Sequence, residues 1–434
     1  MIEGGTPEPG PGRPVDRRIL IYSYDTFGLG HLRRSRTIAN ALVAGSDDVR
    51  AVIVSGSPVA DRYASAERIA CVAIPPVTKR GDGGYASLDP DRPLDSTVAA
   101  RQRIIADTAE AFRPDVILVD KEPTGFHGEM LPTLERQAAR GGRSVLGLRD
   151  VLDEAGRLVP EWARKDASAA VRRLYDEIWI YGVPSIHRPL AALPVAAEVA
   201  DRTIYTGYLL RGLPPARAEP PPAHAEAPPA HAEAPPAHTE AASSIPTRAP
   251  FLLVTPGGGG DGASLIDWVL SAYEADPGLP LPALVAFGPF LAGPDRARFR
   301  ARIAGLPGRL AALDFDAEIE RLIARAAGIV AMGGYNTFCE ILSFDKRAIV
   351  VPRTAPRREQ AIRAEAAGAL GLVRVLLEED GRAPQRMAAA LRGLPDQPLP
   401  SGIVAPGLLD GLDAIRERFD ALTAVVPLPR QASS

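Results

Sequence analysis

Hydrophobic positions fall into short continuous runs, separated by stretches in which apolar residues recur every three or four positions. The runs predict buried β-strands, and the stretches between them predict amphipathic helices. The runs before residue 210 are ILIYS (19–23), AVIVS (51–55), VILVD (116–120), SVLGL (144–148), EIWIYG (177–182) and TIYTG (203–207). Those after residue 250 are FLLVT (251–255), ALVAF (283–287), LAALDF (310–315), GIVAM (328–332) and AIVVP (348–352). This alternation predicts an α/β protein with one doubly wound parallel sheet in each half.

A low-complexity segment separates the two halves. The units PPAHAEA, PPAHAEA and PPAHTEA follow one another over 221–241. They carry no large apolar side chain, so burial cannot offset the entropy of ordering, and we expect a disordered linker over 211–249. The repeat contains His224, His231 and His238, but no set of cysteine or carboxylate ligands accompanies them. This disfavours a metal site.

The linker defines two predicted domains, at 17–210 and 250–405. A chain of 434 residues is too long for one ordinary core, which agrees with this division. The Gly/Pro-rich residues 1–16 and the final residues 426–434 are predicted to be disordered tails.

Composition narrows the function classes. Hydrophobic residues are 46% and charged residues 24% of the chain, as in ordinary soluble domains. The net charge of -3 gives no basic field, so we expect no nucleic-acid partner. The two cysteines form no disulfide framework, which favours the cytoplasm. No apolar run of about 18 residues and no signal-peptide core is present, so only peripheral contact with the inner face of a membrane stays open.

The first glycine loop, in YDTFGLGHLRRS, follows the first predicted strand. Gly28 and Gly30 resemble the start of a dinucleotide-binding G-x-G-x-x-G. Its third glycine is replaced by Arg33, and the second strand ends on Ser55 where an acidic residue would hold a ribose, so the sequence excludes a nicotinamide cofactor. The loop instead places His31 at a helix start. The alternative is a helix-capping turn with a surface histidine.

Two further glycine loops follow strands in the second half. FLLVTPGGGGDG contains four consecutive glycines, which allow a ligand to approach the backbone closely, although a flexible turn is the alternative. In GIVAMGGYNTFCEIL a strand is followed by a glycine pair and a helix start, which is where helices bind phosphate. The donor-site candidates in these loops are Gly257, Gly258, Gly259, Gly260, Gly333, Gly334, Asn336 and Thr337.

Glu340 allows two interpretations. The pattern Thr337-x-x-Glu340 is a capping box, in which the glutamate would serve the helix alone. A carboxylate one turn into such a helix can instead accept hydrogen bonds from both hydroxyls of a ribose. The motif alone does not decide between them.

Charged residues gather where two strands of the first half end. Asp120, Lys121 and Glu122 end one strand, and Arg149 and Asp150 end another. Ligands of parallel sheets bind beyond the carboxyl ends of the strands, so we expect these groups to recognise a polar acceptor. Loop charge or a buried ion pair is the alternative.

The order GLGH, the glycine loop of the second half, MGGYNTFCE and VPRTAPRREQAIRAE resembles the nucleotide-sugar glycosyltransferases of the GT-B fold. The most similar group contains the UDP-N-acetylglucosamine transferase of lipid II synthesis, together with proteins whose glycosyltransferase activity is only predicted. The resemblance spans most of the chain outside the tail and the repeat and is most specific over 328–365. It implies two Rossmann-like domains facing a cleft, with the acceptor on the first and the donor on the second. It also implies that a helix over 406–425 packs back on the first domain.

The resemblance assigns roles to single residues. Glu340 matches the glutamate that holds the donor ribose, and Glu359 with Gln360 matches the pair that reaches the hydroxyls of the donor sugar. The GLGH turn matches loosely, because the family has more glycine and a proline after the histidine. Gly28, Gly30 and Arg33 are therefore assigned to the acceptor side, with an acceptor that is lipid-linked or anionic. A UDP donor rests on the resemblance alone.

The chemistry of transfer fits these positions. The leaving diphosphate needs stabilisation, which the amides of a helix N-terminus supply without a metal, and no D-x-D follows a strand. We therefore expect no metal and no cofactor besides the substrate. The acceptor hydroxyl needs a base, for which His31 and Asp120 are the candidates. The prediction is inverting transfer of a hexose or N-acetylhexosamine to a hydroxyl; a nucleotide-sugar 2-epimerase and a non-catalytic sugar-nucleotide scaffold are the alternatives.

Overall fold

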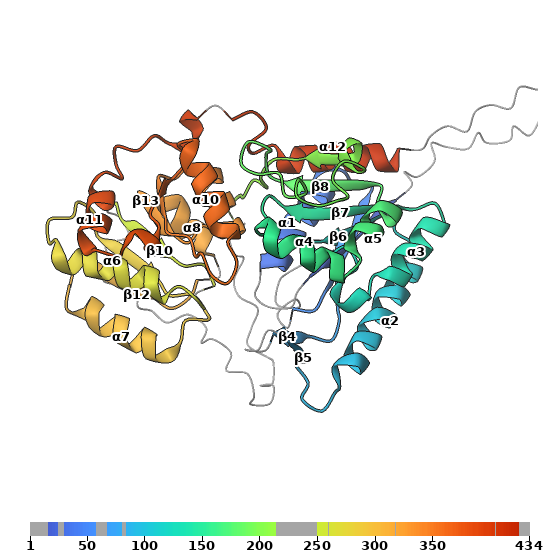
Figure 1. Ribbon diagram of the computed structural model, residues 1–434, viewed down its shortest axis with the longest axis horizontal. Helices are drawn as coiled ribbons and strands as arrows, with labels where there is room; N and C mark the ends of the chain where they lie inside the picture. The colour runs from blue at the N-terminus through green and yellow to red at the C-terminus, as the bar shows by residue number, and fades with distance from the viewer. Residues whose placement is uncertain are drawn as a thin grey trace, which may run out of the picture.

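The computed structural model describes residues 16–24, 30–57, 67–79, 84–213, 250–258, 260–316, 318–403 and 405–424. Two α/β domains lie side by side (Figure 1). The predictions for Gly28, Gly259, both tails and almost all of the linker fall outside the described residues.

The first domain is built on a seven-stranded parallel sheet of order β3-β2-β1-β6-β7-β8-β9. Its strands are β1 (Arg17–Ser23), β2 (Val49–Ser55), β3 (Ile69–Ala73), β6 (Val116–Asp120), β7 (Arg143–Arg149), β8 (Glu177–Tyr181) and β9 (Thr203–Tyr205). An antiparallel pair is formed by β4 (Val77–Lys79) and β5 (Tyr85–Ser87). The helices are α1 (Gly30–Gly45), α2 (Leu94–Phe112), α3 (Leu131–Ala139), α4 (Ala155–Arg164) and α5 (Ala167–Leu174), with short 3₁₀ turns η2 (Phe126–Gly128) and η3 (Ala200–Arg202).

The second domain repeats this plan with six strands in the order β12-β11-β10-β13-β14-β15. They are β10 (Leu252–Thr255), β11 (Ala283–Ala286), β12 (Leu310–Leu313), β13 (Gly328–Ala331), β14 (Ala348–Val350) and β15 (Arg374–Val375). The helices are α6 (Ala263–Ala275), α7 (Gly293–Ala304), α8 (Ile319–Arg325), α9 (Tyr335–Ser343), α10 (Glu359–Ala369) and α11 (Pro384–Arg392), with 3₁₀ turns η4 (Glu378–Asp380) and η5 (Pro400–Gly402).

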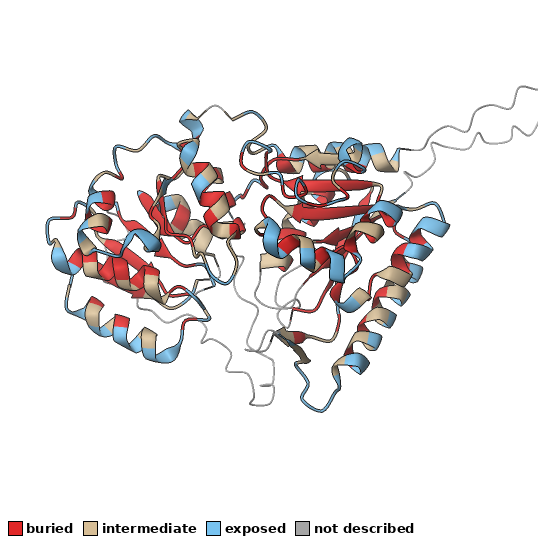
Figure 2. Ribbon diagram, viewed as in Figure 1, coloured by how far each residue is buried: buried red, intermediate tan, exposed pale blue. Residues whose placement is uncertain are grey.

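Burial explains why these runs form strands. The apolar strands β6, β8, β10, β11 and β13 are buried at every position, as expected for parallel strands covered on both faces. Helix α1 turns Leu32, Ser35, Ala39 and Leu42 inward, the face that the sequence pattern predicts. Figure 2 shows the buried residues on the strands and on the sheet-facing sides of the helices. The predicted fold class is confirmed.

Both sheets have a topological switch point, where strand order reverses. In the first sheet it lies between β1 and β6, and in the second between β10 and β13. Ligands of such sheets bind at the loops that follow the strands on either side of the switch point, so the loops after these four strands are the candidate positions.

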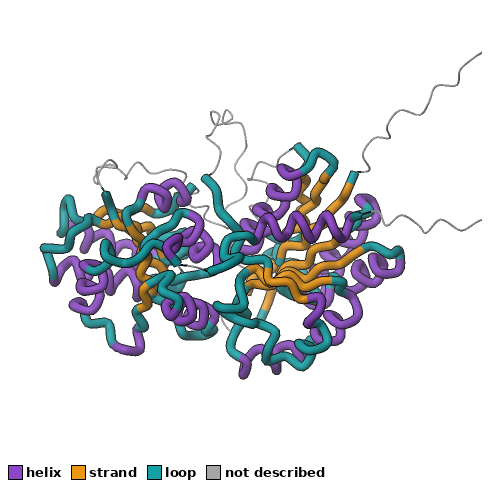
Figure 3. Tube along the Cα trace, turned by 90° about the horizontal axis from the view of Figure 1, so that it is seen from above, coloured by secondary structure: helices purple, strands orange, loops and turns teal. Residues whose placement is uncertain are grey.

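The last helix, α12 (Gly411–Thr423), lies on the first domain and contacts α1 and β6 (Figure 1). Phe419 is buried there, and Arg418 pairs with Glu177 at the start of β8. The chain reaches this position by hydrogen bonding to the end of the first domain, where Tyr208 N donates to Leu408 O at 2.8 Å. Seen from above, loops cross between the two halves (Figure 3). Among the described residues, no helix combines the length and apolar character that crossing a membrane requires.

Candidate active site

His31 and Asp120 meet at the switch point of the first sheet. Helix α1 starts at Gly30, directly after the loop that follows β1, and Asp120 is the last residue of the neighbouring strand β6. His31 Nδ1 lies 2.5 Å from Asp120 Oδ2. The two residues that the sequence offers as alternative bases are therefore partners in one pair.

Arg34 completes this group, because it lies one helical turn after His31 and shares its face. Arg34 Nη2 donates to both oxygens of Asp120 at 2.6 and 2.7 Å, and its Nη2 is 2.9 Å from His31 Nδ1. Burial would raise the pKa of Asp120, but the charges of Arg34 and His31 hold it at about 2. Asp120 therefore stays a carboxylate whose oxygens are occupied, which makes it a poor base and a good positioning partner.

At His31, burial has a larger effect on the pKa than the neighbouring carboxylate has. Burial lowers the pKa of its imidazole to about 3, although Asp120 favours the charged form, and the charge of Arg34 lowers the pKa further. The ring is neutral at physiological pH, and its side chain is 15% exposed. With the Nδ1 proton directed at Asp120, Nε2 keeps a free lone pair that can accept a proton.

The N-termini of α1 and α9 meet across the two domains. Asn336 Nδ2 donates to Gly30 O at 3.2 Å, and Arg211 Nη2 donates to Asn336 Oδ1 at 2.8 Å. Helix α9 starts at Tyr335 after the N-cap Gly334, and no side chain caps it. Its first backbone N–H groups are thus available to an anion.

The bounds of α9 also decide the question of the capping box. A capping box needs Thr337 at the N-cap, whereas Thr337 is the third residue of the helix and Gly334 is the N-cap. That interpretation of Glu340 is wrong, because the glycine ends the loop and the helix begins three residues earlier than the box requires.

The glycine loops of the second domain pack against one another. Gly257 has a φ of +80°, and a Cβ at this position would lie 3.8 Å from Thr337 Oγ1. Gly333 has a φ of +72°, and a Cβ would lie 2.7 Å from Val350 Cγ1, so only glycine fits there. Gly257, Gly258 and Gly260 are exposed, which leaves this backbone open to a ligand.

Glu340 is buried and faces the first domain. Its Oε1 accepts a hydrogen bond from Arg33 Nη2 at 2.6 Å, and Arg33 also pairs with Glu320. Burial raises the pKa of Glu340, although the charge of Arg33 opposes the shift. Arg33 does not point to the acceptor side as expected, because it lies two residues after His31 and so on the far face of α1.

Glu359 and Gln360 begin α10 beside the glycine loop. Glu359 pairs with Arg353 through Oε1, while its Oε2 is buried without a hydrogen-bond partner. Gln360 Oε1 accepts a hydrogen bond from Arg353 N at 3.1 Å, and its Nε2 would lie 3.9 Å from a Cβ at Gly334. A buried carboxylate oxygen without a donor is a position that a sugar hydroxyl can fill.

Asp150 is fully buried and forms an ion pair between the domains. Arg363 Nε and Nη2 donate to its two oxygens at 2.7 and 2.6 Å, and Tyr208 OH donates at 2.6 Å. Arg363 Nη1 also donates to Gly333 O at 3.1 Å. The structure thus favours the ion-pair alternative for Asp150 over acceptor binding. Glu122 is similarly occupied, by Lys165 Nζ at 2.6 Å.

Several residues of this region were missed by the sequence analysis. They are Arg211, Glu320, Arg357 and Arg363, and each bridges elements that are distant in sequence. Only Arg363 leaves a signal in the sequence, because it follows Glu359 by four residues and so shares its helix face. Among the described residues, no cluster of three or more His, Cys, Asp or Glu side chains is arranged to hold a metal.

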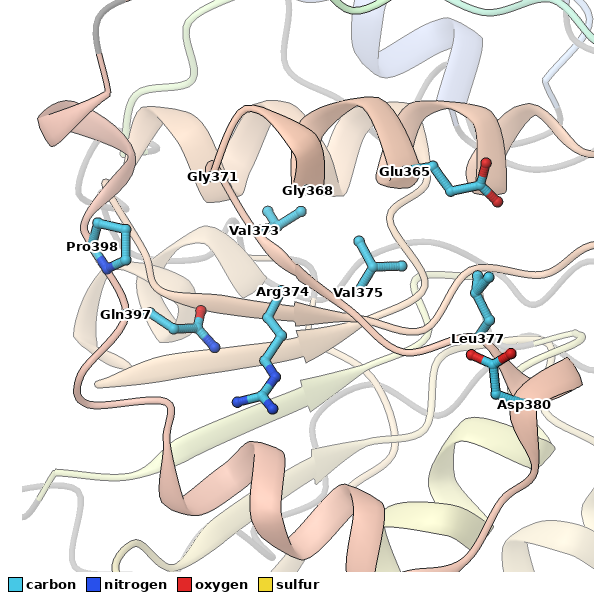
Figure 4. Close-up of a pocket in the computed structure, with 10 residues that line it drawn as sticks. All are labelled: Glu365, Gly368, Gly371, Val373, Arg374, Val375, Leu377, Asp380, Gln397 and Pro398. Carbon is cyan, nitrogen blue, oxygen red and sulfur yellow. The ribbon is translucent and has the colours of Figure 1, made fainter.

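A separate hollow of about 570 Å³ lies at the edge of the second sheet (Figure 4). Its lining includes Arg374, Val375, Glu365, Asp380 and Gln397. None of the predicted site residues lines it, and it belongs to the edge strand β15 rather than to the switch point.

Comparison with known families matches residues 289–399 to the glycosyltransferase family 28 C-terminal domain. The second domain is a glycosyltransferase domain. No curated protein sequence matches the chain. This match confirms the prediction of a glycosyltransferase.

Solved structures of similar shape are glycosyltransferases of diverse kinds. The glycotransferase of kitacinnamycin has a TM-score of 0.54 and 18% identity, over 94% of this chain and 96% of its own. MurG of Acinetobacter baumannii has a TM-score of 0.55 and 11% identity, over 94% and 99%. Phytolacca americana UGT2, complexed with UDP-2fluoro-glucose and pterostilbene, has a TM-score of 0.55 and 12% identity, over 94% of both chains. These likenesses support the GT-B fold but no specific relation to the lipid II transferase, and they give the epimerase alternative no support.

Proposed function

We propose that the protein transfers a sugar from a nucleoside diphosphate donor to a hydroxyl acceptor, with inversion at the anomeric carbon. The observation that carries this proposal is the pairing of His31 with Asp120 at one switch point, directly across from the N-terminus of α9 at the other. These contacts support the proposal because they bring the candidate base close to the candidate anion site between the two domains.

The donor side of the proposal rests on the second domain. The first N–H groups of α9 and the exposed glycines after β10 would stabilise the charge that develops on the leaving diphosphate. Glu340 would hold the ribose after displacing Arg33 from one of its oxygens, and Glu359 with Gln360 would hold sugar hydroxyls. These roles are proposed from the resemblance and agree with the positions of the side chains.

The acceptor side rests on His31. Its Nε2 would take the proton from the acceptor hydroxyl as the hydroxyl oxygen attacks the anomeric carbon and the diphosphate leaves. Asp120 would keep the imidazole in the correct tautomer and stabilise the charge that forms on it. One direct displacement at the anomeric carbon inverts its configuration.

The nucleotide is proposed to be uridine diphosphate. UDP-2fluoro-glucose is the ligand of Phytolacca americana UGT2, and dTDP is the ligand of the glycosyltransferase VinC, which has a TM-score of 0.52 with this chain. Sugars carried by UDP and by dTDP are therefore the first donors to test. Transfer to a lipid-linked or anionic acceptor at a membrane surface is part of the same proposal.

The test is a thermal-shift panel of nucleoside diphosphate sugars, followed by a hydrolysis assay with the best ligand. A ligand at 100 times its Kd should stabilise the protein by about 2.7 kcal/mol. Binding of one nucleotide sugar and slow release of its diphosphate, lost in His31→Ala, is the expected result. Binding without any release would support a scaffold, and release of an epimerised donor would support the epimerase.

A further inference from the structure

Two cationic side chains at the carboxyl ends of the strands of the first sheet, Lys121 and Arg149, lack an ion-pair partner among the residues that the structure describes. In the described part of the chain, the carboxylates around these strand ends are already paired with other cations: Asp120 with Arg34, Glu122 with Lys165, Asp150 with Arg363, Asp153 and Glu161 both with Arg357, and Glu359 with Arg353. The side chains of Lys121 and Arg149 form no hydrogen bond or ion pair with any described residue. Nearby carboxylates act on both cations only through their charge, without a direct ion pair.

The two side chains start from neighbouring strand ends. Asp120 of β6 is opposite Gly147 of β7, so Lys121 and Arg149 extend from the same edge of the sheet. Lys121 N donates to Gly147 O at 2.7 Å, and its φ of +72° is unusual for a residue other than glycine. A strained backbone of this kind is often kept for a functional position.

Lys121 lies close to the proposed base. Its Nζ is 4.7 Å from the centre of the Tyr24 ring, and this ring is 5.8 Å from the ring of His31. A group bound to Lys121 would therefore belong to the substrate that His31 acts on.

The environment of both cations is unfavourable without a ligand. Arg149 is half-buried, and its Nε is buried without a partner. Burial together with Arg149 and Arg357 lowers the pKa of Lys121 to about 8, and burial together with Arg34 lowers the pKa of Arg149 to about 10. A bound anion would relieve both the loss of solvation and the repulsion.

We propose that Lys121 and Arg149 form a subsite for an anionic group, a carboxylate or a phosphate, on the acceptor. This inference rests on the proposed function, because it assumes that the first domain binds the acceptor beside His31. The subsite would orient the acceptor hydroxyl toward Nε2 by fixing a second point of the molecule. A carboxylate on the transferred sugar is the competing source of the anion, because Glu359 faces Arg149 from α10.

The experiment measures the affinity of inorganic phosphate in the presence of saturating UDP, at constant ionic strength. UDP occupies the proposed donor site, so that phosphate reports on the second anion site. Lys121→Gln and Arg149→Gln should each weaken phosphate binding about tenfold, since each removes a charge-assisted hydrogen bond, and the double variant should weaken it more. Arg172→Gln is the matched control, because Arg172 is paired with Glu198 on the exposed surface. It should bind phosphate like the unaltered protein.

The possible results distinguish failure of the subsite from failure of the proposed function. Equal phosphate affinity in the double variant and in the unaltered protein overturns the subsite. If UDP and dTDP both fail to bind the unaltered protein, the proposed function fails, and titration of phosphate alone still judges the subsite by the same variants. If a Gln variant does not fold, Lys121→Arg and Arg149→Lys keep the charge and should retain phosphate binding, whereas neutral Lys121→Met and Arg149→Met should lose it.

A second arm identifies the source of the anion. UDP-glucose and UDP-glucuronic acid differ by one carboxylate on the sugar. If the subsite belongs to the acceptor, the double variant should change the affinity for these two donors by the same factor. A selective loss of UDP-glucuronic acid would place the anion on the donor sugar and overturn the assignment to the acceptor.

Discussion

The two switch points occupy the same place in two sheets of the same strand order, yet they present opposite chemistry. In the second domain the loops after β10 and β13 offer glycine backbone, and the helix that follows starts without a side-chain cap. In the first domain the start of α1 and the end of β6 place a histidine, an arginine and a carboxylate in direct contact. In the proposed function, the loops of the second domain would bind through fixed backbone dipoles, and His31 of the first domain would accept a proton.

Under the proposed function, this difference would assign the two steps of transfer to different domains. Backbone N–H groups cannot titrate, so they can stabilise a leaving diphosphate at any pH. A neutral imidazole held by a carboxylate can accept a proton, which no glycine loop can do. The ion pair of Asp150 with Arg363 joins the two edges, because Arg363 also binds the carbonyl of Gly333.

The largest effect is expected from His31→Ala. Loss of the base should lower the turnover of donor hydrolysis about 10²- to 10⁴-fold, and His31→Asn should be nearly as slow because it keeps polarity without basicity. Initial rates of diphosphate release at saturating donor measure this. Turnover close to that of the unaltered protein would remove His31 from the chemistry.

The buried ion pair between Asp150 and Arg363 should contribute more to the free energy of unfolding than an exposed ion pair does. Arg363→Met leaves the buried carboxylate of Asp150 without its partner, and this should cost about 3–5 kcal/mol of the free energy of unfolding. The control is Arg172→Gln, whose ion pair with Glu198 lies on the exposed surface and should change the free energy of unfolding far less. Urea unfolding of both variants checks this. Equal losses would show that Asp150 and Arg363 do not hold the domains together.

A smaller effect is expected at the donor edge. Glu340→Ala should weaken donor binding by about 1–3 kcal/mol, since hydrogen bonds from the ribose to a charged group would be lost. Glu320 pairs with the same Arg33 and is the matched control, so Glu320→Ala should leave the donor affinity nearly unchanged. Isothermal titration with the donor compares the two. An equal loss in both variants would mean that Glu340 acts only through Arg33.

The smallest effect is expected from pH. Because burial holds the pKa of His31 at about 3, below its ordinary value of 6.5, the neutral base predominates from about pH 5 to 8 and kcat/KM should be flat there. Stability should instead fall as the pH drops below 6.5, because the unfolded chain then binds a proton that the folded chain does not. Rates are therefore measured only where circular dichroism shows folded protein. A drop of kcat/KM centred near pH 6.5 would contradict the buried, neutral state of His31.

The sequence predicts much of the fold and one half of the site. Every apolar run expected as a strand overlaps a strand of the structure, because continuous burial leaves a clear pattern. The strand β3 was missed because IACVA is short and half-exposed, and β15 was missed because it has two residues. The glycine loops were found because positive φ angles and close contacts restrict the residue type to glycine.

The charged half of the site could not be predicted in the same way. Asp120 lies 86 residues from Arg34, and Asp150 lies 213 residues from Arg363, so nothing in the local pattern joins them. Asp150 and Arg149 are adjacent in sequence, yet one is fully buried in an ion pair and the other has no carboxylate partner among the described residues. Which charge is structural depends on the partner that the fold supplies, and this is not encoded in neighbouring residues.

The central claim is that the second domain binds the donor while the first supplies the base. The most direct test is the affinity for UDP, or for dTDP if the panel selects it, measured by isothermal titration for His31→Ala and Glu340→Ala beside the unaltered protein. We predict that His31→Ala binds the nucleotide within about twofold of the unaltered protein, and that Glu340→Ala binds it at least about fivefold more weakly. Loss of nucleotide affinity in His31→Ala with full affinity in Glu340→Ala would contradict the division of labour between the two domains.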